Sequence, residues 1–464
     1  MCESVEAEFK GLFYADSVVV VGATQDPTKL GFYAVQSLLN YSGRVFLVNP
    51  NLSEFDGRRV YPSVSDIPEN VDLAVIAVPA KLVPGVLEEC AKKHVKGASI
   101  ITALFKEVGP EGAELQREIT EIANRAGIKI IGPNTIGFAN LHKGLNASFN
   151  PFFGLLKKGN IAVFCQSGGI SSILSNMAVD ENIGISKIGS LGNRANVDFP
   201  DILEYLLCDD ETDVIALHIE GLDDARRFME AARKVVERKP VVVYKVGKTN
   251  VDKASLSHTG SLSGNYTLYS AMFKQAGVIP VDSPTELLDA AKILALQRPP
   301  RGNRVAVLSV QAGAGIVISD VCAQNGLSVP PFTPETIRKL EELLPPYTIR
   351  TNPVDLAFAS PEGRAEAARI ALEDENIDSL IFFQLYFPSI DPPINELVEC
   401  NKKYGKPVVV VFNRLANLGD EAIAKLEENR IPVYPTPERG AKALAQLFRY
   451  RQILNRLPEG TKRT

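Results

Sequence analysis

A loop of small, hydroxylated residues and glycines surrounds one histidine in the middle of the chain. Residues 253–264 read KASLSHTGSLSG, with His258 near the centre and Gly260 and Gly264 after it. A neutral imidazole on an exposed segment can attack an activated phosphoryl group, and an unperturbed pKa of about 6.5 leaves it mostly neutral near pH 7. The glycines let backbone N–H groups converge on an anion. On composition alone, the loop is equally typical of a polar surface turn with an incidental histidine.

The setting of this loop favours phosphoryl transfer. An apolar run at 240–245 (PVVVYK) precedes it and predicts a buried parallel strand. His258 therefore leaves the carboxyl end of a sheet, where α/β proteins place their chemistry.

A second run, 213–221 (DVIALHIEG), predicts another strand that carries a candidate partner for this histidine. Alternation places His218 and Glu220 on one face, with Glu220 at the carboxyl end. Glu220 could accept the Nδ1 proton of His258, fix its tautomer and leave Nε2 free to attack. The alternative is a solvated glutamate at a strand end. We expect His218 to be a strand residue whose polar atoms are satisfied, without a catalytic role.

The second and third parts of the chain look duplicated. The stretch 159–170 (GNIAVFCQSGGI) matches 302–316 (GNRVAVLSVQAGAGI), and KPVVV recurs at 239–243 and 406–410. In each copy a strand runs into Gln-x-Gly and then a helix, so each offers a helix N-terminus that could hold a phosphate. The alternative is an old duplication kept for packing alone.

The first part of the chain alternates short Val/Ile-rich runs with helical patterns, which predicts βαβ units and a parallel, doubly wound sheet. The first strand turns at 22–31 (GATQDPTKLG), which lacks GxGxxG; the glycine turn could serve tight packing alone, but a helix N-terminus beside Lys29 suits a diphosphate. The second strand ends at Asn49 rather than at an acidic residue, so the usual ribose contact of NAD is missing. We expect a nucleotide other than NAD.

Composition narrows the class of protein. The chain has 464 residues, of which 45% are hydrophobic and 23% charged, as in ordinary globular proteins. A net charge of −5 argues against a nucleic-acid-binding surface. The acidic first residues lack a signal core, no apolar run is long enough to span a membrane, and the six scattered cysteines and four histidines show no metal-ligand cluster. We expect a cytoplasmic protein without a metal site.

Taken together, these motifs resemble the nucleoside-diphosphate-forming acyl-CoA synthetases, most closely the α subunits of the ADP-forming acetyl-CoA synthetases. The resemblance spans nearly the whole chain and depends on an ordered set of short motifs: GAT at 22–24 with Gly31, GPN at 132–134, QSGG at 166–169, SLGN at 190–193, EG at 220–221 and SHTGS at 257–261. It implies an α/β fold with a Rossmann-like CoA-binding domain (1–150) and two flavodoxin-like three-layer domains. The first of these (151–298) is succinyl-CoA-synthetase-like and carries the histidine loop, and the second (299–464) is a ligase domain.

The resemblance also implies a reversible reaction: acetyl-CoA, phosphate and ADP give acetate, CoA and ATP through an acyl phosphate and a phosphohistidine. By motif match, His258 is the phosphorylated residue and Glu220 its orienting carboxylate. The implied phosphate contacts are Gln166, Ser167, Gly168, Gly169, Asn193, Thr259, Gly260 and Gly313. The implied CoA contacts are Gly22, Ala23, Thr24, Lys29, Gly31, Asn49, Val78, Pro79, Ile101 and Thr102, with Gly132 and Asn134 near the thioester.

Some positions depart from the family pattern. Thr135 stands where relatives often carry cysteine, and 311–315 (QAGAG) replaces an NAGG-type turn. Ala103 stands where succinyl-CoA synthetases have a glutamate, which favours the acetyl branch over the succinyl one.

The chain contains neither GxxxxGK[ST] nor an ATP-grasp pattern. The resemblance therefore implies an ATP-grasp β subunit that binds ADP or ATP with Mg²⁺ in an α2β2 heterotetramer, while CoA and phosphate bind this chain. The alternatives are a CoA-binding sensor or scaffold without turnover, the same chemistry with another acyl-CoA such as succinyl-CoA, and an NAD-dependent dehydrogenase, which the missing GxGxxG and acidic residue disfavour.

Overall fold

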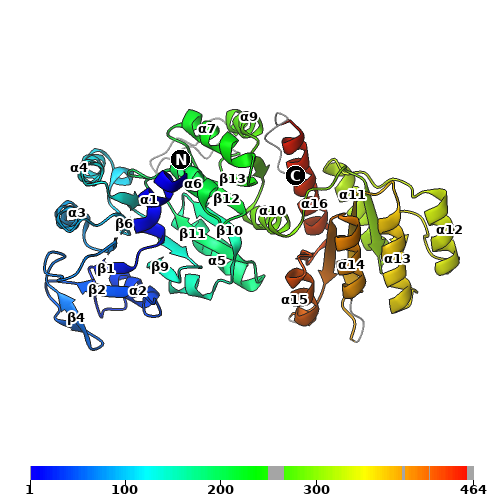
Figure 1. Ribbon diagram of the computed structural model, residues 1–464, viewed down its shortest axis with the longest axis horizontal. Helices are drawn as coiled ribbons and strands as arrows, with labels where there is room; N and C mark the ends of the chain where they lie inside the picture. The colour runs from blue at the N-terminus through cyan, green and yellow to red at the C-terminus, as the bar shows by residue number, and fades with distance from the viewer. Residues whose placement is uncertain (1, 249–265, 389–391, 417, 457–464) are drawn as a thin grey trace. The chain divides into compact units, whose positions relative to one another are not determined.

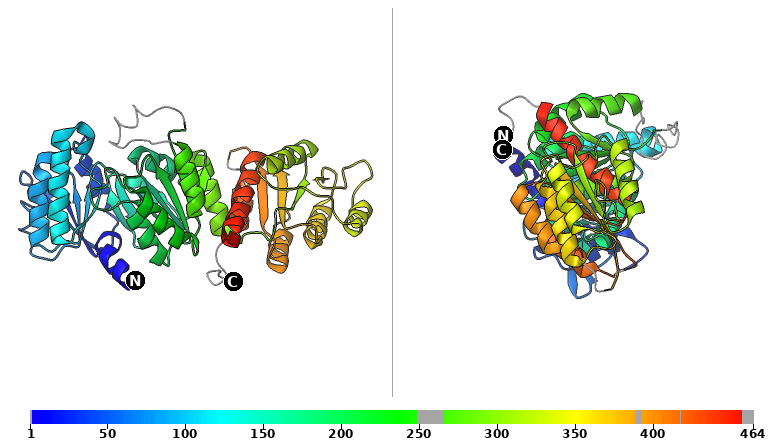
Figure 2. Two further views of the ribbon diagram at one scale, coloured as in Figure 1. Left: turned by 90° about the horizontal axis from the view of Figure 1, so that it is seen from above. Right: turned by 90° about the vertical axis from the view of Figure 1, so that its right-hand side faces the viewer.

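The computed structural model describes residues 2–248, 266–388, 392–416 and 418–456. The chain divides into two units, 1–287 and 288–464, which are described one at a time. Figure 1 shows their strands and helices in chain order, and Figure 2 shows helices packed along the sheets.

The first sheet has the strand order of a Rossmann fold. Its parallel strands run β4-β2-β1-β5-β6-β7, which is the 3-2-1-4-5-6 order of dinucleotide-binding sheets, and β3 adds an antiparallel edge. The strands are β1 (Ser17–Val21), β2 (Arg44–Val48), β3 (Glu54–Phe55), β4 (Arg58–Tyr61), β5 (Leu73–Ile76), β6 (Gly97–Ile100) and β7 (Lys129–Ile131). The helices are α1 (Cys2–Phe13), α2 (Leu30–Ser37), α3 (Val83–Lys92), α4 (Pro110–Ala126) and the short η1 (Ala80–Leu82) and η2 (Lys106–Val108).

Both faces of this sheet are buried, which explains why its strands read as continuous apolar runs rather than alternating ones. Val18 and Val20 pack in one core with residues of α1 and α2. Val19 and Val21 pack in another core with residues of α3 and α4. Alternate side chains of a single strand thus anchor helices on opposite faces.

The second sheet lies in the same unit, and its parallel strands run β14-β13-β12-β10-β11, the 2-1-3-4-5 order of flavodoxin. A hairpin of β8 and β9 extends it antiparallel to β11, so residues 137–148 belong to this sheet; the domain boundary at 150 stays a prediction. The strands are β8 (Gly137–Asn140), β9 (Leu145–Ser148), β10 (Lys158–Cys165), β11 (Ile185–Ser190), β12 (Val214–Ile219), β13 (Val241–Lys245) and β14 (Ile279–Val281). The helices are η3 (Pro151–Leu155), α5 (Gly168–Asp180), α6 (Phe199–Cys208), α7 (Ala225–Val236) and α9 (Tyr266–Ala276), and α10 (Pro284–Leu296) leads into the second unit.

The second unit repeats this topology. Its sheet order, β16-β15-β17-β18-β19, is again 2-1-3-4-5, and the predicted fold class is confirmed. The strands are β15 (Val305–Ser309), β16 (Val354–Asp355), β17 (Ser379–Leu385), β18 (Val408–Asn413) and β19 (Val433–Tyr434). The helices are α11 (Ala312–Gln324), α12 (Pro334–Leu343), α13 (Pro361–Glu373), α14 (Ile394–Tyr404), α15 (Asp420–Glu428) and α16 (Pro437–Arg456).

The two lysines of the KPVVV repeats make the same contacts in the two copies. Lys239 Nζ donates to the carbonyls of Leu206 and Asp209 at the end of α6, each at 2.6 Å. Lys406 Nζ donates to the carbonyls at 372 and 374 at the end of α13, at 2.8 and 2.7 Å. Each lysine satisfies carbonyls that a helix end leaves open. The predicted duplication is therefore present in three dimensions.

In the structure, the alignment of the two copies differs by one residue from the predicted match of Gln166 with Gln311. The Gln166 N–H donates to the His218 carbonyl at 2.9 Å, and the Val310 N–H donates to the Phe383 carbonyl at 3.2 Å. Gln166 therefore corresponds to Val310, and His218 to Phe383. The residues that precede α5 and α11 are Ser167 and Gln311, and these two correspond.

A disulfide joins Cys2 of α1 to Cys208 of α6, which are separated by 206 residues in sequence. The other four cysteines are buried free thiols. In the described part of the chain, no helix is both long and apolar enough to cross a membrane.

Candidate functional site

The first part of the site is a turn that brings β1 and α2 into close contact. Gly22 follows β1 with φ of +94°, and its N–H donates to the Val48 carbonyl at 2.9 Å. A Cβ on Gly31 would lie 2.0 Å from the Gly22 carbonyl oxygen, so only glycine allows this approach. The N-terminus of α2 is thereby fixed beside the carboxyl ends of the strands.

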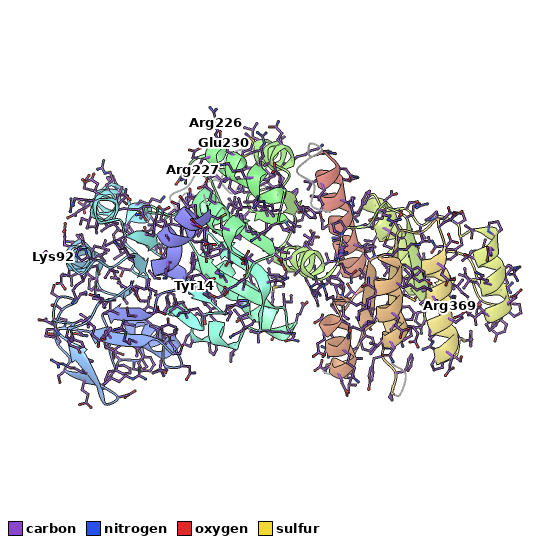
Figure 3. All side chains as sticks on the ribbon, in the orientation of Figure 1. Tyr14, Lys92, Arg226, Arg227, Glu230 and Arg369 are labelled. Carbon is purple, nitrogen blue, oxygen red and sulfur yellow. A yellow bond between two sulfur atoms is a disulfide. The ribbon has the colours of Figure 1, made fainter. Side chains whose placement is uncertain are left out.

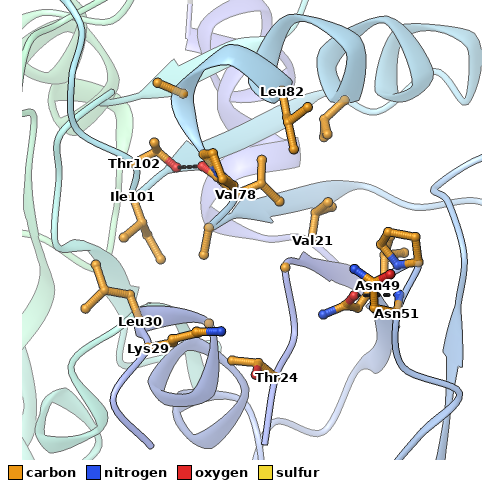
Figure 4. A pocket seen from close by; sticks show the side chains of 18 of the residues that line it. Val21, Thr24, Lys29, Leu30, Asn49, Asn51, Val78, Leu82, Ile101 and Thr102 are labelled. Carbon is orange, nitrogen blue, oxygen red and sulfur yellow. Dashed lines mark hydrogen bonds between the residues drawn. The ribbon is translucent and has the colours of Figure 1, made fainter. Parts of the chain in front are cut away.

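A cleft of about 960 Å³ opens at these strand ends (Figure 4). Every residue predicted to contact CoA lines it except Ala23, which lies behind the wall. The Ala23 carbonyl accepts a hydrogen bond from Asn49 Nδ2 at 2.8 Å. Thr102 Oγ1 donates to the Val78 carbonyl at 2.6 Å, which ties the loops after β5 and β6 together. The cleft is large enough to bury much of a nucleotide-sized ligand.

Lys29 places a cation at this cleft. Its Nζ lies 3.6 Å from the carboxylate of Asp26, and its side chain is mostly exposed. It precedes α2, whose first turn has no side-chain cap, so open N–H groups and a positive charge lie together. The site can therefore receive an anionic ligand.

Sequence reasoning missed part of the cleft wall. Asn51, Leu82 and Leu104 also line the cleft, and Leu104 is exposed with φ of +76°. The only signal in the sequence was the position of Leu104, directly after the predicted CoA contacts Ile101 and Thr102.

A second cavity, of about 430 Å³, adjoins the cleft and shares Leu30, Ile101 and Ala103 with it. Its other walls come from the second sheet and the segment that leads to it. The residues that line it are Leu30, Ile101, Ala103, Asn134, Thr135, Ile136, Phe149, Gln166, Ser167, Gly168, Gly169, Ser172, Gly192 and Asn193. None of these described lining residues carries a charged side chain. The structure therefore brings together, around one cavity, all the predicted phosphate contacts of β10–α5 and β11.

The N-terminus of α5 opens into this cavity. Ser167 precedes the helix in an extended conformation and makes no side-chain cap, so the first N–H groups of the helix lack that partner. A Cβ on Gly168 would touch Ile136 at 3.3 Å, whereas Gly169 has more space. The helix dipole and open N–H groups make this wall suited to an oxyanion.

Asn193 links the cavity to the first sheet. Its Nδ2 donates to the carboxylate of Glu107 and to Gln116 Oε1, and its Oδ1 accepts from Asn134 Nδ2 at 3.5 Å. Gly132 lies behind the cavity wall, with φ of +108° and its carbonyl accepting from the Ala195 N–H. The side chain of Asn193 thus joins the parts of the unit that carry the cleft and the cavity.

Glu220 lies directly after β12 and is buried, with 6% of its surface exposed. Its N–H and that of Gly221 both donate to Gln166 Oε1, at 2.9 and 3.0 Å. The side chain of Gln166 therefore holds the Glu220 turn. Burial and the nearby charge of Glu220 raise the pKa of the Cys165 thiol, which keeps that thiol protonated.

His218 is a buried strand residue, but the expectation that its polar atoms are satisfied is wrong. Its ring is 1% exposed, and neither nitrogen has a hydrogen-bond partner in the described part of the chain. Burial, with a smaller contribution from the Lys245 charge, lowers the pKa of His218 to about 3. The imidazole is neutral at physiological pH.

His258, Thr259 and Gly260 lie outside the described residues, and their roles stay predictions. Gly313 is in the first turn of α11 in the second unit. By the alignment of the two copies it corresponds to Gly169.

Comparison with known proteins agrees with this arrangement. Three family models match in order: "CoA binding domain" at 16–140, "Succinyl-CoA ligase like flavodoxin domain" at 158–294 and "Ligase-CoA domain" at 305–458. The alpha subunit of acetate–CoA ligase (ADP-forming) II from Pyrococcus furiosus is 40% identical over 93% of this chain and 95% of its own length. The chain belongs to the family of ADP-forming acetate–CoA ligases.

Two further relatives extend the comparison. Acetate–CoA ligase (ADP-forming) I from Archaeoglobus fulgidus is 43% identical over 95% of this chain, and the match spans 64% of that protein. The dinucleotide-forming acetyl-coenzyme A synthetase 1 of Ca. Korarchaeum cryptofilum, solved in complex with phosphate and ADP, superposes with a TM-score of 0.87 at 35% identity, over 96% of this chain and 97% of that one. The chain is thus a member of a ligase family over nearly its whole length.

Proposed function

We propose that this chain is the α subunit of an ADP-forming acetyl-CoA synthetase, which converts acetyl-CoA, phosphate and ADP to acetate, CoA and ATP. The observation that carries the proposal is that the cleft and the α5 cavity share Leu30, Ile101 and Ala103. A thioester that extends from CoA in the cleft would reach the N-terminus of α5. Holding phosphate there against the thioester removes an entropic barrier.

In the first step a phosphate oxygen attacks the thioester carbonyl, the C–S bond breaks and CoA leaves as the thiolate. The open N–H groups at Ser167–Gly169 stabilise the developing negative charge. Asn134, which lines the cavity, contributes at the thioester end. The product is acetyl phosphate, with the energy of the thioester retained in the acyl–phosphate bond.

In the second step Nε2 of His258 attacks phosphorus, the bond to the acyl oxygen breaks and acetate leaves. Glu220 accepts the Nδ1 proton in a hydrogen bond and stabilises the charge that forms on the imidazole. Thr259 and Gly260 contact the phosphoryl group.

The acyl group is acetyl or another acyl group without a second carboxylate, rather than succinyl. Among the described residues around the second cavity there is no cation to pair with a second carboxylate. Ala103 in this wall adds no charge.

Phosphohistidine then passes its phosphoryl group to ADP on an ATP-grasp β subunit, which holds the nucleotide with Mg²⁺, in a cytoplasmic α2β2 enzyme. The support is that the Pyrococcus furiosus relative is named an alpha subunit and that the Archaeoglobus fulgidus relative is longer than the matched region.

The test is to incubate the full chain with acetyl-CoA and labelled phosphate, alone and with the candidate partner and ATP, and to measure acid-labile, base-stable label. His258→Ala is the control. We expect label in the wild type and none in this variant. CoA binding without label under either condition would contradict the proposal and support the CoA-sensor alternative.

A further inference from the structure

The turn of Glu220 and Gly221 is held from two sides. On one side Gln166 Oε1 accepts both N–H groups of the turn, at 2.9 and 3.0 Å. On the other side Arg194 Nη1 donates to the Gly221 carbonyl at 2.9 Å. Gln166 follows β10, which pairs with β12, and Arg194 follows β11, which pairs with β10. The ends of three strands therefore meet at the Glu220–Gly221 turn.

Arg194 adopts this position at a cost. Its side chain is 1% exposed, between Asp198 at 3.2 Å and Asp223 at 3.0 Å. Its backbone has φ of +60°, a left-handed conformation that residues with a side chain rarely adopt. A buried cation in a left-handed backbone persists only where its surroundings require it, and such residues concentrate at functional sites.

The second unit shows that this flavodoxin-like fold does not require the arrangement. Gln166 corresponds there to Val310, and Glu220 to Leu385. The loop that follows β16 reads LAFAS up to α13 and has no basic residue in place of Arg194. The same sheet order therefore forms with apolar residues at both positions. What the first copy adds is the carboxylate and the two side chains that hold it.

We propose that Arg194 is a positioning residue that acts through Glu220, with Gln166 as its counterpart. This inference depends on the proposed function, in which Glu220 orients His258. Arg194 fixes the carbonyl side of the turn and Gln166 fixes the N–H side, so the Glu220 turn is held by contacts that do not involve His258. Arg194 lines neither the cleft nor the α5 cavity.

The test compares single-turnover rates of phosphohistidine formation, with acetyl-CoA and labelled phosphate, in the enzyme assembled from the full chain and its partner. Arg194→Ala should lower the rate about 10- to 100-fold, as loss of an orienting partner does elsewhere, while KM for acetyl-CoA stays within about twofold. Combined with Glu220→Gln, Arg194→Ala should cause no further loss, because both changes remove one function.

Two further variants serve as controls for the effect of Arg194→Ala. Arg194→Lys keeps the buried charge beside its carboxylates but cannot make the same set of bonds, so we expect a folded protein that is still slowed several-fold. Arg227 lies on α7 near Arg226 and Glu230 (Figure 3) and pairs with Asp201 at 2.6 Å. Arg227→Ala should leave the rate unchanged.

Wild-type rates of phosphohistidine formation in both Arg194 variants would overturn the inference. The inference would also fail if Arg194→Ala lowered the rate as much in the Glu220→Gln background as it does alone. If His258→Ala removes the label while the Arg194 variants keep wild-type rates, only this inference fails. If His258→Ala retains the label, the proposed function itself fails.

Discussion

Replacing His218 with phenylalanine should remove a pH-dependent loss of stability. His218 is buried, and neither ring nitrogen has a hydrogen-bond partner among the described residues. Burial lowers its pKa from the ordinary value of 6.5 to about 3. The corresponding residue of the second unit is Phe383, which is 5% exposed in the core of the same sheet order. The variant therefore installs in the first copy the residue that the second copy already accommodates.

The size of the effect follows from linkage. Between a folded-state pKa of about 3 and the ordinary value of 6.5, the unfolded chain binds one more proton at this position than the folded chain does. The stability of the folded state is therefore full above the ordinary value and falls as the pH drops towards the folded value. From about pH 7 to about pH 5 this one group costs about 2 kcal/mol.

The assay is equilibrium urea denaturation of wild type and His218→Phe at these two pH values. We expect the free energy of unfolding of the variant to fall by about 2 kcal/mol less than that of the wild type. A matched control is His94→Asn, since His94 is exposed and has φ of +55°, which asparagine tolerates. An equal acid-induced loss in wild type and His218→Phe would refute the reasoning, because it would mean that His218 is protonated in the folded state.

Two further experiments test the scaffold around the site. Gly31→Ala should weaken CoA binding, measured by titration, at least tenfold, because the added Cβ would lie 2.0 Å from the Gly22 carbonyl oxygen. The control is Gly154→Ala, which should bind CoA normally because no atom lies within 4 Å of the added Cβ. Normal CoA binding by Gly31→Ala would show that the close approach of Gly31 to Gly22 is not needed. Lys239→Met and Lys406→Met should each destabilise the chain by about 1–3 kcal/mol in denaturant, because each leaves helix-end carbonyls without their donor. If only one of these two lysine variants lost stability, the two lysines would not contribute equally to the stability of their copies.

The sequence predicted the layers of the fold well because buried parallel strands appear as continuous apolar runs. It failed in the alignment of the two copies, where Gln166 was matched with Gln311. The amino-acid sequence alone allowed that match if an insertion was assumed. The hydrogen bonds of β10 with β12 and of β15 with β17 instead align Gln166 with Val310, one residue before Gln311.

The candidate site was predicted from sequence to a smaller extent. The glycine turn at Gly22 and the α5 terminus could be located because each follows a strand. The contacts of Arg194 with Gly221 and Asp223 could not, because these residues belong to the loop after β12, whereas Arg194 belongs to the loop after β11. No local pattern marks a residue whose partners meet only after the sheet has formed.

The duplication separates what this fold needs from what the chemistry needs. Lys239 and Lys406 occur in both copies and satisfy helix ends, so they serve the fold. Glu220 occurs only in the first copy, and there it is held by a glutamine side chain and a strained, buried arginine. A copy that required these polar groups for folding would keep them, and the second unit does not. The first copy therefore carries polar groups that the fold does not need, at the turn where we propose that Glu220 orients His258.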